Sequence, residues 1–379
     1  MRWRVLAAAC LLAVIVDGVQ RSLPTGELRD FGSFVASGQA GTRGEDPYGI
    51  HPLTFHVVLP GFDVWNPNLN PPISVPMFRA FGVLPPQQAF RYWWGFSFVC
   101  YLLTVALLIQ RYGGRDVWLL SLWAFALAGF WDTLALGQIY TPLVLAATVS
   151  WLLLERRHWL VAGVLMGAVV AMKPNFVVWP AALLLAGHVR APLAAAAATI
   201  VLAVIPVLTH GAGIYVRWAA VILADESRTA FLTNASIPGL AQRLGFAPLG
   251  IVCSLLIVAA IAWWAYRRRP SVMEASAIGI LGGIAASPIA WVHYTLFLLP
   301  VFFRLRTSAP LLPAALLLVI PVAVVLRFLD APMWQQATIG SSYNWAVVVL
   351  LAVLARRESR VSLPACRSAP ETPGRQVPV

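Results

Sequence analysis

Charged residues are scarce in this sequence. Of its 379 residues only 11% are Asp, Glu, Lys or Arg, whereas 60% are hydrophobic, and a soluble domain typically carries about 25% charged residues. The mean hydropathy is +0.77. These values exclude an ordinary soluble protein and indicate a chain that crosses a membrane several times.

Cysteine and the common cofactor motifs are also missing or rare. The four cysteines, Cys10, Cys100, Cys253 and Cys366, follow no metal-ligand spacing, so we interpret them as small apolar residues rather than as disulfides or metal ligands. The sequence lacks a Gly-rich nucleotide loop of the Rossmann or Walker type and lacks an internal repeat. Paired acidic residues spaced for a divalent cation are missing as well, so no metal and no cofactor are expected.

Long apolar runs dominate what is present. Runs of roughly 15 to 22 residues match a hydrocarbon core about 30 Å thick. We expect spans near residues 5–20, 92–110, 117–135, 141–154, 159–172, 175–189, 193–209, 248–265, 273–287, 294–303, 310–326 and 342–355. The predicted fold is therefore an all-α polytopic membrane protein, a bundle of about 12 transmembrane helices.

The arginines predict the orientation of this bundle. If the N-terminus is cytoplasmic, short arginine-rich turns such as "RYGGRD", "ERRH" and "YRRRP" all fall inside, as the positive-inside rule requires. The inner segments then hold 17 Arg and 5 acidic residues, which accounts for the whole net charge of +12. We therefore expect both termini in the cytoplasm of a multi-pass plasma-membrane protein. The basic charge reports topology and does not indicate nucleic-acid binding.

Two long segments, residues 21–91 and 210–247, are predicted to lie outside. Apolar residues such as Phe31, Phe34 and Val35 recur there at helical spacing, which favours helices along the membrane interface. Residues 1–355 are expected to form a single transmembrane domain. Residues 356–379 are rich in Pro, Ser and charge and are expected to be a disordered cytoplasmic tail.

Several polar residues fall at the predicted outer ends of helices, namely Asp17, Asp132, Gln138, Lys173 and His293. Ionisable groups at membrane depth are costly and by default indicate a functional site. The alternative is anchoring at the interface, which we favour for Asp17 and Asp132. The candidate functional surface is therefore the outer one.

Three stretches in this order, "RDFGSFVASGQAGTRGEDPYG", "NLNPPISVPMF" and "SPIAWVHYTLFLLP", resemble glycosyltransferase family 87, whose members use polyprenyl-phosphate sugars. "LALGQIYTPLVLAA" and "AMKPNF" add weaker matches, and the resemblance runs from about residue 5 to 355. It implies the GT-C architecture, with an active site at the extracytoplasmic face near the end of the first helix.

The resemblance implies an inverting transfer of a sugar, mannose first and arabinose second, from a polyprenyl-phosphate donor to a glycolipid or glycan acceptor among the membrane lipids. The missing nucleotide loop agrees with a lipid-linked donor. A transporter or flippase for a lipid-linked sugar is the alternative from another class. Transporters place ionisable groups near the midplane and often contain repeats, whereas here the polar groups lie at one face.

The resemblance maps a general base onto Asp30 and a catalytic histidine onto His293. Asp30 could instead be the N-cap of a helix over "FGSFVASG", and a lone His among apolar residues is more often a satisfied core residue. Pro288, before His293, is expected to break the helix and let the imidazole face a cavity.

The leaving phosphate is an anion, so Lys173, Arg43 and Arg91 are the candidate donor-phosphate ligands. Lys173, the only lysine, could instead extend to the interface as an anchor.

Asp46, Tyr48, Asn70, Gln138 and Tyr140 are expected to line the substrate pocket. "NPNLNPP" is either a rigid floor of this pocket or only a connector. Asp46 precedes Pro47 and could be a turn residue instead. Tyr140 stands where the family commonly has Asn, which leaves the polar role of that position open.

Overall fold

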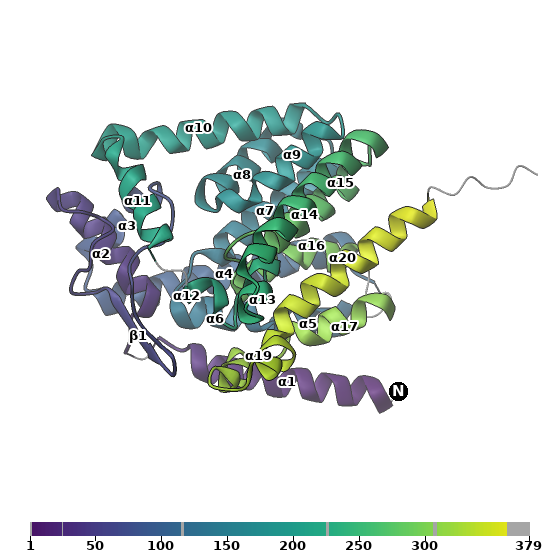
Figure 1. Ribbon diagram of the computed structural model, residues 1–379, viewed down its shortest axis with the longest axis horizontal. Coiled ribbons are helices and arrows are strands. Elements are labelled where there is room, and N and C mark those ends of the chain that lie inside the picture. Colours follow the sequence, from purple (N-terminus) through teal and green to yellow (C-terminus); the bar gives the residue numbers. More distant parts are fainter. Residues whose placement is uncertain (1, 25, 115–116, 225–226, 306–308, 362–379) are drawn as a thin grey trace, which may run out of the picture.

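The computed structural model describes residues 2–24, 26–114, 117–224, 227–305 and 309–361 (Figure 1). The N-terminal part contains α1 (Arg2–Ser22), α2 (Arg29–Arg43), β1 (Phe55–Leu59), β2 (Phe62–Asn66), α3 (Ser74–Arg79) and η1 (Ala80–Val83). The first group of apolar helices is α4 (Pro86–Tyr112), α5 (Val117–Ala126), α6 (Ala128–Leu136), α7 (Tyr140–Glu155), α8 (Trp159–Met172), η2 (Pro174–Val177), α9 (Val178–Leu185) and α10 (Arg190–His210).

The second long loop contains α11 (Gly213–Leu223), α12 (Ser227–Ala230) and α13 (Ile237–Arg243). The remaining elements are α14 (Ala247–Arg268), α15 (Val272–Ala285), η3 (Val292–Leu298), α16 (Leu299–Leu305), η4 (Ala309–Leu311), α17 (Leu312–Leu317), α18 (Val322–Val325), η5 (Leu326–Phe328), α19 (Met333–Ala337), η6 (Ile339–Ser341) and α20 (Ser342–Val361). The prediction of a helical membrane protein is confirmed.

The expected number of crossings is not confirmed. Among the described residues, five helical segments are long and apolar enough to span a membrane, and the number rises to seven if α5 with α6 and η4–α17 with α18–η5 each count as one bent span. The other expected spans correspond to shorter apolar helices such as α7, α8 and α15. These short helices lie in the core, because their small residues let neighbouring backbones approach closely: a Cβ on Gly163 of α8 would stand 2.3 Å from the Ala191 carbonyl oxygen of α10.

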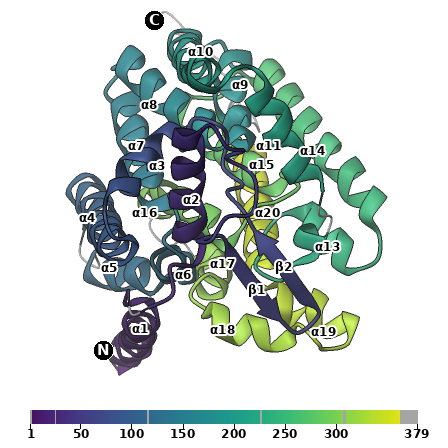
Figure 2. The same ribbon diagram turned by 90° about the vertical axis from the view of Figure 1, so that its left-hand side faces the viewer.

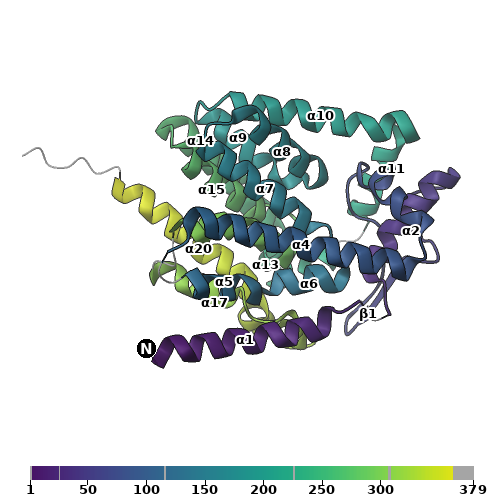
Figure 3. The same cartoon turned by 180° about the vertical axis from the view of Figure 1, so that it is seen from behind.

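The turns predicted to share the inner side do meet at one end of the bundle. Glu155 accepts hydrogen bonds from Arg111 at 2.8 Å and from Arg304 at 2.9 Å, which joins three of these turns. His188 and the Pro270 carbonyl lie 2.9 Å apart, which joins two more. The N-terminus and the C-terminal end of α20 lie at this end too (Figures 1 and 3).

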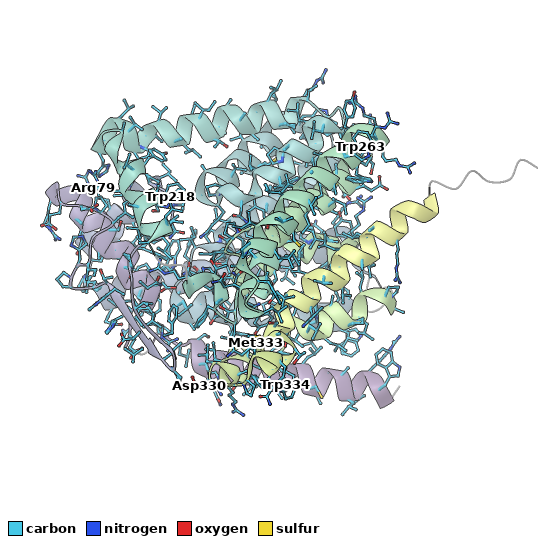
Figure 4. All side chains as sticks on the ribbon, in the orientation of Figure 1. Arg79, Trp218, Trp263, Asp330, Met333 and Trp334 are labelled. Carbon is cyan, nitrogen blue, oxygen red and sulfur yellow. The ribbon has the colours of Figure 1, made fainter. Side chains whose placement is uncertain are left out.

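The two long loops gather at the opposite end. Figure 4 places Arg79 of α3 and Trp218 of α11 at this end, across the molecule from Trp263 of α14. Trp218 donates to the Leu69 carbonyl at 3.1 Å and so links the two loops. The two long loops therefore lie at the end of the bundle opposite the arginine-rich turns, whereas the membrane topology and the side that faces the cytoplasm stay predictions.

Helix α2 does not lie along the interface as expected, because its apolar face is buried inside the protein. Phe31 and Val35 are fully buried. The Phe31 ring packs on Phe90 at 5.4 Å and on Trp93 of α4 at 6.1 Å between centroids. The helical periodicity in this loop therefore reflects packing against the bundle, and this packing fixes the position of the residues at the start of α2.

A β-hairpin is the element that the sequence analysis missed. β1 and β2 pair antiparallel with Leu59 opposite Phe62, and Pro60 with Gly61 forms the turn, where Gly61 has φ 69. A Pro followed by a Gly with positive φ is typical of a type II turn. In Figure 2 the hairpin lies across the face of the bundle that is turned to the viewer. It is the small exception to the all-α prediction among the described residues.

The C-terminal boundary also differs from the prediction. Helix α20 continues to Val361, past residue 356, where the tail was expected to begin. Residues 362–379 of the expected tail lie outside the described residues.

Candidate functional site

A cavity of about 570 Å³ opens at the end of the bundle that carries the two long loops. Its walls come from the start of α2, the hairpin, the loop after β2, the α6–α7 turn, Lys173, the loop around α12 and η3. The acidic, basic and amide residues that line it are Glu27, Arg29, Asp30, His56, Asn66, Asn70, Asp132, Gln138, Lys173, Arg228 and His293. Six residues predicted for the site, Asp30, Asn70, Gln138, Tyr140, Lys173 and His293, therefore come together here.

Asp30 lies in the first turn of α2 and is 5% exposed. The N-cap position is Leu28, which makes no side-chain cap, so the N-cap alternative for Asp30 is wrong. Its carboxylate instead accepts hydrogen bonds from Asn66 at 2.7 Å and from Gln138 at 2.5 Å. Burial raises the pKa of Asp30 above its usual value, and these two hydrogen bonds partly offset the rise.

Gly137 allows the α6–α7 turn to pack closely against α2, so that Gln138 reaches Asp30. It ends α6 in a left-handed conformation, with φ 67, which favours glycine. A Cβ at this position would stand 2.6 Å from the Cβ of Phe31. Because the turn can lie directly against α2, the amide of Gln138 reaches the carboxylate next to Phe31.

The loop after β2 connects the cavity residues through three asparagines. Asn66 holds Asp30, and Asn70 Oδ1 accepts from Lys173 at 2.8 Å. Between them, buried Asn68 donates to Ser37 of α2 at 3.0 Å and accepts from the Asn70 backbone N–H at 3.0 Å. The loop is fixed by side-chain hydrogen bonds on both sides, as predicted for a rigid floor.

Lys173 lies between α8 and η2, where Pro174 starts the next helix, and is 8% exposed. Its ammonium lies 4.4 Å from the ring centroid of Tyr140 and 5.5 Å from that of Tyr294. A cation over two aromatic faces with one amide acceptor is held by the protein interior. This placement contradicts the interfacial-anchor alternative, because the side chain points into the cavity instead of toward lipid headgroups.

His293 is buried at 3% exposure on η3, after the break that Pro288 introduces. Its ring stacks on Tyr140 with centroids 4.9 Å apart, and Nε2 lies 2.8 Å from a carboxylate oxygen of Asp132. Neither ring nitrogen has an aligned hydrogen bond to another described residue. The interpretation of Asp132 as an interfacial anchor is therefore wrong, since it lines the cavity beside His293.

Arg228 is a cavity residue that the sequence analysis missed. It is 5% exposed, lines the cavity and donates to the Trp65 carbonyl of β2 at 3.1 Å. Arg29 also lines the cavity and has φ 47, which is unusual for a residue with a side chain. Nothing in the local sequence distinguishes these arginines from others in the two outer loops.

Four predicted site residues lie outside the cavity lining. Arg43, the last residue of α2, pairs with Glu45 at 2.8 Å on the surface, and Arg91 lies on the exposed side of α4. Asp46 accepts from the Tyr48 backbone N–H at 3.1 Å, which confirms the turn alternative. Tyr48 is buried behind the asparagine loop and donates to the Asn70 carbonyl at 3.0 Å, so it supports the floor from outside.

A second polar cluster holds the cavity loops together. Arg243 of α13 is 5% exposed and donates to Ser341 and to the Phe231 carbonyl, both at 2.9 Å. It also donates to the Asn234 carbonyl at 3.1 Å, while Asn234 Oδ1 accepts from the Ala290 backbone N–H at 2.9 Å. This cluster fixes the loop that carries Arg228 to the segment that leads into η3.

No group of three or more His, Cys, Asp or Glu side chains that could hold a metal ion occurs in the described part of the chain. The expected absence of a metal stays a prediction.

Comparison with known proteins gives one match. The family model for glycosyltransferase family 87 matches residues 68–288, more than half of the 379 residues. Asn70, Asp132, Gln138, Lys173 and Arg228 lie within the matched segment, whereas Asp30 and His293 lie outside it. No curated protein and no solved structure matches the chain.

Proposed function

The chain belongs to glycosyltransferase family 87, and we propose that it transfers mannose from a polyprenyl-phosphate donor to a lipid or glycan acceptor at the extracytoplasmic face. The observation that carries the proposal is one buried carboxylate, Asp30, held by Asn66 and Gln138 in a cavity that Lys173 and Arg228 also line. A base beside fixed cations is the arrangement that sugar transfer from a phosphate requires.

Asp30 is the general base in this proposal. Its carboxylate takes the proton of the acceptor hydroxyl while the hydroxyl oxygen bonds to the anomeric carbon of the sugar. The bond from that carbon to the donor phosphate oxygen breaks, and its electron pair leaves with the polyprenyl phosphate, which gains one negative charge. A single direct displacement of this kind inverts the anomeric centre.

The cations of the cavity hold the leaving phosphate. Lys173 and Arg228 are both buried, so their attraction for the new charge is weakly screened. His293 lines the same cavity, with its Nε2 2.8 Å from a carboxylate oxygen of Asp132. Because Asn70 and the Tyr140 ring already fix Lys173, little reorganisation is needed as the phosphate departs.

Apolar side chains complete the site. Phe34 of α2, Phe62 of β2, and Phe231 and Trp291 from the two later loops line the same cavity. Such walls exclude water, which would otherwise compete with the acceptor hydroxyl for the donor. The hairpin adds Phe55, Val57, Val58 and Leu59 to these walls, so it covers the reacting groups.

Product analysis tests the proposal. The purified protein is incubated with polyprenyl-phosphate-mannose or polyprenyl-phosphate-arabinose and a glycolipid acceptor extracted from bacterial membranes, and products are analysed by mass spectrometry. We expect a new mannoside of inverted configuration. A new arabinoside instead would make the protein an arabinosyltransferase, and movement of unchanged donor across a vesicle membrane without any glycoside would make it a transporter.

A further inference from the structure

Arg243 lies outside the lining of the cavity, and every hydrogen-bond donor of its side chain is used. It belongs to the last turn of α13 and is 5% exposed. Each of its five N–H groups donates to a neutral oxygen, and the acceptors are Ser341 Oγ, Asn344 Oδ1 and the backbone carbonyls of Ala230, Phe231 and Asn234. Among side chains only arginine offers five donors in one planar fork. This position therefore uses the shape of the guanidinium as well as its charge.

Three of these acceptors belong to the turn that carries Arg228 or follow it closely. Helix α12 is a single turn, in which Arg228 is the second residue and Ala230 the last. The last carbonyls of a helix have no partner within it, and here the Arg243 guanidinium binds the carbonyls of Ala230 and Phe231. From the other side, Arg228 Nη2 donates to the Trp65 carbonyl at 3.1 Å. The backbone next to Arg228 is therefore held from α13, and the end of its side chain is held from β2.

The remaining two acceptors connect α13 to a helix of the bundle. Ser341 and Asn344 belong to a candidate membrane span, Met333–Arg356, and both are fully buried. Asn344 also donates to the carbonyl of Ser236, the N-cap residue of α13. Helix α13 therefore stands between α12 and the start of α20 and is fixed at both of its ends (Figure 1). Arg243 joins the turn of Arg228 to this span.

We propose that Arg243 is a positioning residue of the donor site: it holds the turn of α12 against α20, so that the guanidinium of Arg228 stays directed at the donor phosphate. This inference rests on the proposed function, in which Arg228 binds that phosphate, and adds to it the residue that fixes Arg228 from behind the cavity wall. An effect of charge alone would need only a cation at position 243. Positioning needs all five donors, and lysine has three, so lysine would leave at least two of the acceptors without this donor.

Arg243→Lys separates these two roles, because it keeps the charge and removes the fork. The measured quantity is the dissociation constant of a long-chain polyprenyl phosphate without a sugar, determined on purified full-length protein in detergent. The unfolding temperature of the same samples is measured beside it. Arg228→Met removes the cation that is positioned. Wild type, the two single variants and the double variant form a double-mutant cycle, which measures whether the two residues act together.

We expect Arg228→Met to weaken binding about ten- to a hundredfold, as the loss of one hydrogen bond to a charged group would. Arg243→Lys should weaken binding at least about fivefold where Arg228 is present and less than about twofold in the Arg228→Met background, because the group that it positions is then absent. A residue that only stabilises the fold would lower the unfolding temperature and change binding by the same factor in both backgrounds.

A matched pair of serines tests the proposal with Arg243 in place. Ser341 accepts from Arg243 Nε at 2.9 Å and donates to the Gln336 carbonyl at 2.7 Å. Ser342 is also buried and donates to the Ile339 carbonyl at 2.6 Å, but it is not among the five acceptors of Arg243. Each change to alanine removes one buried hydroxyl, and only Ser341→Ala removes an acceptor of the guanidinium. We expect Ser341→Ala to weaken binding about two- to fivefold and Ser342→Ala to bind like wild type.

Wild-type affinity of Arg243→Lys, or an equal loss in both backgrounds, would overturn the proposal. So would an Arg228→Met protein that binds like wild type, because no phosphate ligand would then be positioned. If Arg243→Lys does not fold, equal affinities of the two serine variants would overturn it. Because no sugar is transferred in this assay, its result is independent of product analysis. A coupled cycle in a protein that forms no glycoside would disprove the proposed transfer alone.

Discussion

Gln138 donates a 2.5 Å hydrogen bond to the carboxylate of Asp30 across 108 positions of sequence. The bond joins the α6–α7 turn to the first turn of α2, and it leaves Asn66 to hold the other carboxylate oxygen. With both oxygens oriented by amides, the carboxylate keeps lone pairs free for one further proton donor. An acceptor hydroxyl in the cavity would supply that donor.

Replacing Asp30 tests the base directly. We expect Asp30→Asn to preserve the fold and donor binding, because the side chains have the same shape, and to lower kcat at least about a hundredfold through loss of the general base. Turnover under saturating donor and acceptor measures it. Asp46→Asn, outside the cavity, is the matched control and should keep full activity. Normal turnover in Asp30→Asn together with loss in Asp46→Asn would assign the base to Asp46.

The pH profile should report the environment of Asp30. Burial raises its pKa, and the base acts only when ionised, so kcat/KM should fall as the pH decreases through this raised pKa. Gln138→Leu removes a hydrogen bond that stabilises the charged form. The acidic limb should therefore move to higher pH in this variant. Gln39→Leu, which affects a glutamine bonded to the Gly82 carbonyl, should leave the limb in place, and an unmoved limb in both variants would exclude Asp30 as the titrating base.

Lys173 should matter for the donor more than for the fold. Lys173→Met keeps the length of the side chain but removes the ammonium, and a hydrogen bond to a charged group contributes about 1.5 to 3 kcal/mol. We expect kcat/KM for the donor to fall about ten- to a hundredfold. Arg43→Met removes a surface cation that pairs with Glu45 and should change little. Equal donor kinetics in both variants would leave Lys173 without a role in phosphate binding.

Sidedness is tested by single cysteines in a variant whose four native cysteines are replaced by alanine. Val83, 84% exposed in η1, should react as cysteine with a membrane-impermeant thiol reagent added to intact cells. Arg268, at the end of α14, should react as cysteine only after the cells are permeabilised. The opposite labelling pattern would place the cavity in the cytoplasm.

Polar residues of the cavity could be predicted from the sequence where a break in a helical pattern lies next to them. Lys173 interrupts an apolar helical pair, and His293 follows a helix-breaking proline. Gln138 follows a glycine that ends a helix. Each signal is contained in a few neighbouring residues, and the hydrophobic period around it sets the depth of the side chain. Asp30 was found through the family resemblance, and its two hydrogen-bond donors come from distant segments.

Arg43 and Arg91 show why the charge of a residue and its predicted side of the membrane were insufficient to identify the cavity residues. Asp30 and Arg43 are in the same helix, but α2 places them at opposite ends, about 20 Å apart at a rise of 1.5 Å per residue. Arg91 is on α4 with Phe90 and Trp93, which are buried, while Arg91 itself faces outward. Which face a helix presents depends on its tertiary partners, and sequence position does not specify it.

Asp132 was wrongly assigned to the interface and Arg228 was missed, because no local signal marks either residue. Their importance depends on contacts with His293 and with the hairpin, at separations that no local pattern records. The hairpin itself did carry a signal, because "FHVVLPGFDVWN" has β-branched and aromatic residues on both sides of a Pro-Gly turn. In a chain dominated by helices this short signal was overlooked.

The asparagine loop binds the two oppositely charged groups of the cavity separately. Asn66 donates to the carboxylate of Asp30 and Asn70 accepts from the ammonium of Lys173, while the side chain of Asn68, between them in the loop, accepts from the Asn70 backbone N–H. Opposite charges in a medium of low dielectric constant attract strongly, and a direct ion pair between them would neutralise both the base and the anion ligand. In the proposed mechanism the two neutral amides of this loop instead keep the charges apart, so that both remain available to the substrates.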